Sequence, residues 1–387
     1  MRRPLLRLPL ALVTLLALTA PAAVAQPAAT RRVPTVDDLL ALAQVGSAAI
    51  SPDGAWVAYT QTESDFEQDA FVTHVWLVRT GGGAPFQLTR GPKSAGAPQW
   101  SPDGRWLAFT STRVGDKSQV FAIRPDGGEA VQLTKAEGGV NDFAWSEDGT
   151  QIAFTATEPE DQARKRRKDH LGDFEVVRGD YRHAHLWTVA VADAMKAPAA
   201  GTQRTRGTSL HVGSFAWSPG GSRIAFSATV TPGLAQSGTA DIFVLDLAGN
   251  HVRPLVSQPG PDTSPRWSPD GSQVAFRSAM GRLDHYHANA RLAVVPAAGG
   301  TPRSLTDDFD ENPSLVAWAG DGLIYFSAAQ RTATHLFRLD PATGRHMRVS
   351  GPDALAAGSF TLPRAARQLA YVAAPPPPMP GGFVSTA

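Results

Sequence analysis

The chain has 387 residues, of which 36 are lysine or arginine and 35 are aspartate or glutamate, and it contains no cysteine. The balanced charge gives no global field that would favour nucleic acid or a membrane surface as a partner. The absence of cysteine excludes disulfides, thiolate metal sites and a cysteine nucleophile.

The N-terminal residues 1–25 predict a signal peptide. Several arginines at the start precede an apolar run from Leu10 to Ala20, which ends in a small-residue cleavage site at residues 23–25. The apolar run is too short for a comfortable transmembrane helix. We therefore expect a periplasmic or secreted protein with no membrane span after cleavage.

Residues 26–46 follow as an N-terminal segment, and within it residues 35–43 predict a short helix. Thr35 can cap this helix, and two aspartates fall in its first turn, where the helix dipole favours negative charge.

A turn followed by a short apolar strand then recurs along the chain at a nearly regular spacing. The copies are 51–59, 101–109, 146–154, 218–226, 268–276, 319–326 and an eroded one at 363–371. Three of them begin Ser-Pro-Asp-Gly, and three others keep the final glycine. In this turn proline presets φ, aspartate suits the next position, and glycine takes the left-handed conformation that ends a hairpin turn. The aspartates and glycines of the repeated turns are Asp53, Gly54, Asp103, Gly104, Asp148, Gly149, Gly221, Asp270, Gly271, Asp321 and Gly322.

Each repeat has room for four strands, which predicts a propeller blade. A buried strand with a central alanine follows each turn, and then come a third apolar strand and a short outer strand such as 86–89. We expect an all-β, seven-bladed β-propeller over residues 47–374, with four-stranded blades and a degenerate or incomplete last blade, in which Ala366 replaces the turn glycine. Residues 375–387 form a proline-rich tail.

The longest gap between turns holds an insertion with one basic run, Arg164 to Lys168. Acidic residues flank this run on both sides, so we interpret it as a solvated loop and not as a binding patch.

No metal site or cofactor is predicted. The pairs His183/His185 and His285/His287 could each offer two imidazoles, but the spacing fixes no third ligand. The acidic run 307–311 lacks the glycine and the spaced ligands of a calcium loop.

Together, the exported N-terminus, the helix with two aspartates, the Ser-Pro-Asp-Gly blades and the Gln-Leu-Thr outer strands resemble a known family. This combination is similar to the non-catalytic propeller of secreted prolyl oligopeptidase-family serine peptidases, in the bacterial dipeptidyl-aminopeptidase and acylaminoacyl-peptidase branch. Residues 173–187 add to the resemblance, which covers roughly residues 32–375.

In that family an α/β-hydrolase domain with a Gly-x-Ser-x-Gly nucleophile follows the propeller. No serine of this chain has glycine at both positions, because Ser209 and Ser222 each have only the preceding one. No catalytic residue is therefore carried over, and we expect a fragment or truncated product without the hydrolase domain that is inactive alone. The resemblance implies two partners, a hydrolase domain in cis and a peptide substrate.

The resemblance also suggests where the substrate would bind, because acidic side chains of related propellers bind the free amino terminus of the peptide. The candidates in the insertion are Glu175, Asp180, Tyr181 and Arg182. Two alternatives stay open: a TolB-like periplasmic scaffold that binds a protein or peptide, and a propeller lactonase with an axial metal.

Overall fold

The computed structural model describes residues 33–172, 176, 179, 181–351, 356–363, 368–374 and 383–384. The predicted signal peptide and nearly all of the proline-rich tail lie outside these residues. The chain divides into residues 1–40 and residues 41–387. No helix among the described residues is long and apolar enough to cross a membrane.

The first unit contains the predicted helix, α1 (Val36–Leu40). The N–H of Asp38 donates to Oγ1 of Thr35 at 3.2 Å, and Oδ2 of Asp38 accepts the N–H of Thr35 at 2.7 Å. Thr35 therefore caps the helix as its sequence predicts.

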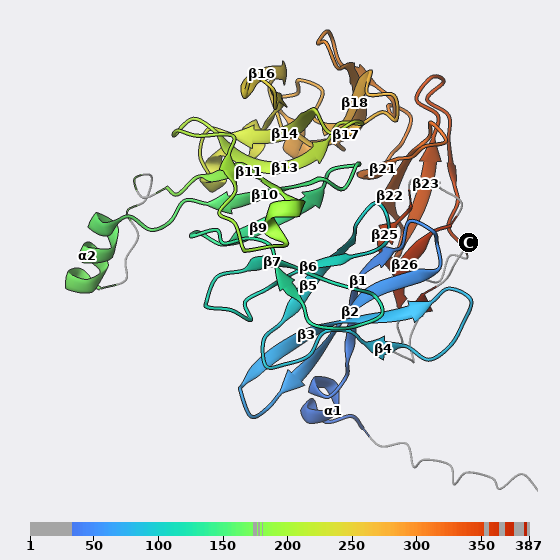
Figure 1. Cartoon of the computed structure of the whole chain (residues 1–387). Helices are drawn as coiled ribbons and strands as arrows, with labels where there is room; N and C mark the ends of the chain where they lie inside the picture. Colours follow the sequence, from blue (N-terminus) through green and yellow to red (C-terminus); the bar gives the residue numbers. More distant parts are fainter. Residues whose placement is uncertain are drawn as a thin grey trace, which may run out of the picture. The chain divides into compact units, whose positions relative to one another are not determined.

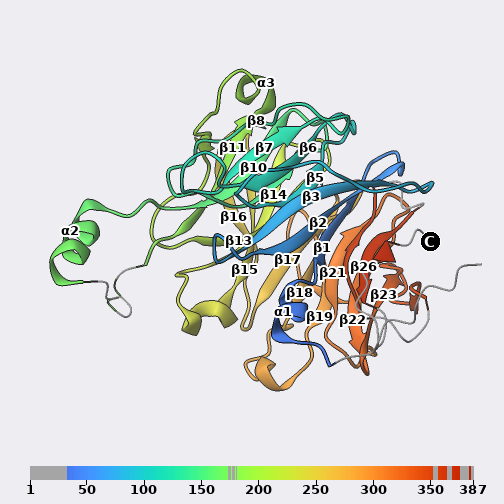
Figure 2. The same cartoon turned by 90° about the horizontal axis from the view of Figure 1, so that it is seen from below.

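The second unit is built from six sheets, which are antiparallel except for one parallel pairing in the sixth (Figures 1 and 2). The strands of the first three are β1 (Gln44–Ile50), β2 (Trp56–Asp65), β3 (Ala70–Arg79), β4 (Phe86–Gln87); β5 (Ala95–Trp100), β6 (Leu107–Ser111), β7 (Gln119–Ile123), β8 (Val131–Gln132); and β9 (Val140–Trp145), β10 (Gln151–Thr157), β11 (Ala184–Ala190), β12 (Thr202–Gln203). The strands of the next two are β13 (His211–Trp217), β14 (Arg223–Thr229), β15 (Asp241–Asp246), β16 (His251–Val256); and β17 (Asp262–Trp267), β18 (Gln273–Ser278), β19 (Arg291–Pro296), β20 (Arg303–Ser304).

The sixth sheet has seven strands, and it corrects the predicted blade number from seven to six. Its strands are β21 (Ser314–Trp318), β22 (Ile324–Gln330), β23 (Ala333–Leu339), β24 (His346–Arg348), β25 (Ala356–Thr361), β26 (Ala370–Ala374) and β27 (Phe383–Val384). The eroded repeat does form the hairpin β25–β26, but β25 pairs in parallel with β23 through Thr334 and Ala356. The hairpin therefore extends the sixth sheet and does not form a separate blade.

The other short elements lie in connections between strands. They are α2 (Gln162–Leu171), α3 (Val191–Ala194) and the 3-10 turns η1 (Leu234–Thr239) and η2 (His285–His287). The basic run that was interpreted as a loop is helical, because it lies within α2. Asp161 caps α2 by accepting the N–H of Arg164 at 2.7 Å, and the run consists of residues that favour helix.

The repeated turns have the predicted geometry. In the first, the N–H of Gly54 donates to the carbonyl of Ser51 at 2.9 Å, and the N–H of Ala55 donates to Oδ1 of Asp53 at 3.0 Å. Gly54 has φ of 73°, in the left-handed region that favours glycine. The same glycine N–H bond recurs at Gly104, Gly149, Gly221, Gly271 and Gly322.

Neighbouring sheets pack through the alanines and tryptophans of the repeat. The alanines within the second strands of the first five sheets, and the one that begins β26, are fully buried: Ala58, Ala108, Ala153, Ala225, Ala275 and Ala370. Three tryptophans before the turns donate an indole N–H to a carbonyl in the first strand of a neighbouring sheet. The pairs are Trp100–Ala49 (2.9 Å), Trp217–Ala144 (3.1 Å) and Trp267–Ala216 (3.1 Å). These bonds fix the spacing of adjacent sheets.

The last hairpin packs against the first sheet. Ala370 of β26 belongs to one buried cluster with Ile50 and Val57 of the first sheet. The N–H of Ala48 also donates to Oγ of Ser359 in β25 at 2.8 Å. This contact joins the two ends of the propeller without a strand shared between its first and last sheets.

Candidate functional site

The strand directions separate two sides of the propeller. The first strand of each sheet runs toward its repeated turn, and the antiparallel second strand runs away from it. The connections between second and third strands therefore lie on the side opposite the turns, which we call the long-connection side. In the first five sheets these connections are residues 66–69, 112–118, 158–183, 230–240 and 279–290.

Large apolar side chains are exposed on this side. We define the apolar rim as Phe66, Phe71, Val114, Leu171, Val230, Leu234, Leu283 and Tyr286. Leu234 and Leu283 are 89% and 82% exposed, respectively. A single exposed apolar residue is ordinary on a protein surface. Here each of the five connections contains at least one residue of the apolar rim. This distribution is typical of a surface that another molecule covers.

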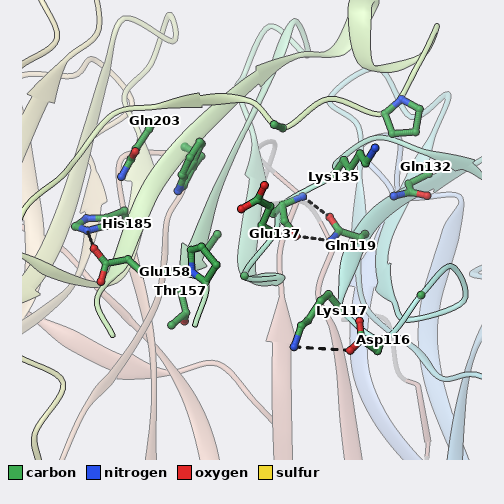
Figure 3. Close-up of a pocket in the computed structure, with 18 of the residues that line it drawn as sticks. Asp116, Lys117, Gln119, Gln132, Lys135, Glu137, Thr157, Glu158, His185 and Gln203 are labelled. Atoms are coloured by element: carbon green, nitrogen blue, oxygen red, sulfur yellow. Dashed lines mark hydrogen bonds and ion pairs between the residues drawn. The ribbon is translucent and has the colours of Figure 1, made fainter. Parts of the chain in front are cut away.

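A cavity of about 1130 Å³ opens between the second and third sheets. Its outer wall forms where the N–H of Lys135 donates to the carbonyl of Ala199 at 2.8 Å. Figure 3 shows Glu158, His185 and Gln203 on one wall and Gln119, Gln132 and Lys135 on the other.

Aromatic and amide side chains form the floor of the cavity. Trp187 and Gln203 lie directly opposite each other in the β11–β12 pairing, so both side chains point to the same face of the sheet. The Trp187 indole stacks on Phe154 with ring centroids 6.3 Å apart. Gln119 is buried, and its Nε2 donates to the carbonyl of Ala136 at 2.8 Å. These side chains could make both stacking and hydrogen-bonding contacts with a ligand.

Beside the cavity, three histidines and one glutamate form a cluster at the base of the insertion, in which His183 and His185 are buried. Nε2 of His185 lies 3.2 Å from Oε1 of Glu158, and Nδ1 of His183 lies 3.8 Å from Oε2. The N–H of Ala184 donates to Nδ1 of His211 at 3.1 Å. The rings of His183 and His185 stack with centroids 6.3 Å apart. The cluster joins the insertion to the third and fourth sheets.

The environment of His185 and His211 disfavours their protonation. Burial lowers the pKa of His185 below its usual value, against the opposing effect of Glu158. Burial also lowers the pKa of His211, and the neighbouring His183 and His185 lower it further. A neutral His211 is also what the bond from Ala184 requires, because a protonated Nδ1 cannot accept it.

Acid should therefore destabilise the protein through this cluster. Unfolded histidine takes up a proton near pH 6.5, whereas folded His185 and His211 do so only at lower pH. Just below pH 6.5 the unfolded state binds more protons, so the free energy of unfolding falls as pH falls. We expect a lower urea midpoint at pH 5.5 than at pH 7.5.

The variant His211→Asn tests this assignment, because asparagine can accept the bond from Ala184 and cannot be protonated in this range. In this variant the free energy of unfolding should depend less on pH. The control His251→Asn, at an exposed histidine, should keep the full pH dependence. An unchanged pH slope in His211→Asn would contradict the prediction.

The predicted substrate-chamber residues are only partly described. Glu175 and Asp180 lie outside the described residues. The hydroxyl of Tyr181 approaches the backbone of Gly233, where an added Cβ would lie 2.7 Å from it. Nε of Arg182 donates to the carbonyl of Glu158 at 2.8 Å. Tyr181 and Arg182 therefore lie at the base of the insertion, next to the histidine cluster.

Sequence reasoning missed Glu158 and His211 as partners of His183 and His185. The pair His183/His185 was noted only as a possible metal site, and among the described residues no group of three or more ionisable side chains could hold a metal ion. The spacing of His183 and His185 predicted that both rings lie on the same side of the chain, and the two rings do stack, although His183 precedes β11. Nothing in the sequence signalled that His211 of the next sheet would join them.

This fold and its repeated turns define a β-propeller. The model of the family described as TolB beta propeller domain matches residues 20–178 and 199–351. These ranges make up more than half of the chain, which therefore belongs to this family.

Related proteins confirm the expected resemblance to peptidase propellers. Dipeptidyl-peptidase 5 of Porphyromonas gingivalis is 29% identical over 336 residues, covering 80% of this chain and 48% of the relative. Acylaminoacyl peptidase of Pyrococcus horikoshii matches with a TM-score of 0.66 at 14% identity, covering 89% of this chain and 51% of that chain. This chain therefore spans about half the length of these two relatives.

The propeller domain of a protease, solved as a separate domain, shows the same fold. The β-propeller domain of the trilobed protease from Pyrococcus furiosus matches with a TM-score of 0.61 at 13% identity, covering 89% of this chain and 95% of that chain. Its description as an open velcro topology is consistent with the way β25 and β26 meet the first sheet here.

Proposed function

We propose that this chain is the substrate-gating, non-catalytic propeller of an exported prolyl oligopeptidase-like serine peptidase. The observation that carries the proposal is the apolar rim, which leaves one side of the propeller suited to being covered. The long-connection side is also where β1 begins and β26 ends, as the antiparallel pairings require. A hydrolase domain joined to the propeller would therefore meet this side.

In this arrangement the propeller acts by enclosure. A hydrolase domain seated on the long-connection side would leave only narrow access to its active site, so short unfolded peptides would enter and folded proteins would not. The cavity between the second and third sheets opens on the same side, at the base of the insertion. Its polar walls would contact a peptide held between the two domains.

The test compares the chain alone with the chain joined to any hydrolase domain encoded beyond codon 387. Alone, it should neither react with a fluorophosphonate serine probe nor hydrolyse peptides. Joined, it should hydrolyse a short peptide and leave a folded protein intact. Labelling of the chain alone would refute the non-catalytic role.

The apolar rim provides a second test, in which the two parts are produced separately and mixed. The variant Leu283→Ser/Tyr286→Ser should weaken their association at least tenfold, because it removes apolar area from the contact. Met347→Ser, at an exposed residue of β24, should not weaken it. Absence of any Gly-x-Ser-x-Gly sequence beyond codon 387 would instead favour the TolB-like scaffold, which the family match also supports.

A further inference from the structure

The basic helix α2 stands apart from the sheets. Both views show it projecting from the propeller at the end of its connection (Figures 1 and 2). None of its residues is buried. It begins three residues after Pro159, which lines the cavity, so it stands beside the cavity mouth on the long-connection side.

The helix concentrates positive charge in a nearly neutral chain. Residues 164–168 are five consecutive cations, and Asp169 is the single acid within α2, which gives the helix a charge of 5 − 1 = +4. The whole chain has a net charge of +1, so the remaining residues sum to 1 − 4 = −3. Acidic residues precede the helix, and Nε of Arg164 lies 3.6 Å from Oε1 of Glu160, so the positive charge of α2 is concentrated from Lys165 to Lys168.

The helix offers no apolar face. Five consecutive cations occupy every direction around a helix with 3.6 residues per turn. The apolar residues of α2 are only Ala163 and Leu171, at opposite ends. Insertion into a lipid interface requires a continuous apolar face, which α2 lacks. Its partner must therefore be recognised by charge and hydrogen bonding.

Like charges within α2 also oppose its own stability. Arg164 and Lys168 are four residues apart, and Lys165 and Lys168 are three apart, so these pairs repel on the helix surface. Helices of this length are marginal in water. An anionic partner would relieve the repulsion and stabilise the helix, so its binding and the helix content of α2 should be coupled.

We propose that α2 is an electrostatic docking element for acidic peptide segments, which it draws to the long-connection side. Arginine guanidinium groups pair with carboxylates through two parallel hydrogen bonds, and the exposed Arg166 of the run carries such a group. As a statement about the substrates of a peptidase, this inference rests on the proposed function. The binding step itself requires only this chain.

The probe is a fluorescein-labelled peptide of alternating Glu and Gly, compared with the same peptide carrying Gln in place of Glu. Fluorescence anisotropy should show binding of the acidic peptide at about 50 mM salt and at least tenfold weaker binding at about 300 mM, because salt screens exposed charges. The neutral peptide should bind at least tenfold more weakly than the acidic peptide at the lower salt concentration.

The variant Lys165→Glu/Arg166→Glu should reduce affinity for the acidic peptide at least tenfold. The matched control Arg105→Glu/Arg345→Glu makes the same charge change at exposed residues on the side of the repeated turns. This control should keep the affinity of the unmodified chain for the acidic peptide. Circular dichroism and the urea midpoint establish that both variants fold.

Equal binding of the two peptides, or unchanged binding by the α2 variant, would overturn the inference. Binding of anionic vesicles or polyphosphate without binding of the acidic peptide would also overturn it, because the partner would then be a different polyanion. If the joined enzyme shows no peptidase activity while the chain still binds the acidic peptide through α2, the proposed function fails and the docking role stands.

Discussion

Phe326→Ala is expected to lower the free energy of unfolding by about 3–5 kcal/mol, the usual cost of emptying a buried phenylalanine site. Phe326 has no exposed surface and lies in β22, where its ring stacks on Phe337 with centroids 5.1 Å apart. The ring of Phe309 meets it edge-on at 5.2 Å. The strands around this site are held in register by hydrogen bonds, so they cannot collapse into the cavity.

Urea unfolding followed by tryptophan fluorescence measures this change. The matched control is Phe66→Ala, because Phe66 is 65% exposed at the tip of the β2–β3 connection, and its loss should change stability by less than about 0.5 kcal/mol. A cost below about 1 kcal/mol for Phe326→Ala would mean that the sixth sheet is not packed as described.

The repeated turn made the strands predictable because its residues specify one local geometry. Glycine at φ of 73° and an aspartate that accepts a backbone N–H determine where each hairpin turns, whatever packs around it. The buried alanine behind each turn followed from the same pattern, since only a small side chain fits between closely packed sheets. Both features are local: the glycine recurs at six turns, and the aspartate and the buried alanine each recur at five of them.

The number of sheets could not be predicted from the repeated turns alone. Counting turns predicted seven blades, but a turn does not determine which strand edge its hairpin will pair with. β24 pairs only with residues 337–339 of β23, which leaves the first part of that edge open. Unpaired strand edges are unfavourable, and Ala356 of β25 pairs with this open part at Thr334.

The site depended on contacts between distant segments, which the sequence does not specify. The wall of the cavity needs Lys135 to meet Ala199, and the histidine cluster needs His211 to reach the backbone of Ala184. The apolar rim is made of single residues in connections of unrelated sequence. These residues share a side only because every second strand runs in the same direction. The sequence could also have indicated the helical state of α2, through Asp161 and the residues after it.

Gly138→Ala is expected to cost about 3 kcal/mol and to disturb the cavity directly. A Cβ at Gly138 would lie 1.6 Å from the carbonyl oxygen of Thr157 and 2.8 Å from its carbonyl carbon. Both are backbone atoms at the end of β10, so relief requires the strand to move and not a side chain to rotate. Costs of this size are at the upper end of those measured for overpacked sites.

The movement should reach the histidine cluster, because Thr157 is followed by Glu158, whose carboxylate holds His185. Gly138→Ala should therefore change the pH dependence of unfolding as well as the urea midpoint. Gly81→Ala is the matched control, since an added Cβ there meets no atom within 4 Å. A stable Gly138→Ala protein with an unaltered pH slope would show that residues 136–139 do not pack against the base of the insertion, and the described wall of the cavity would then be wrong.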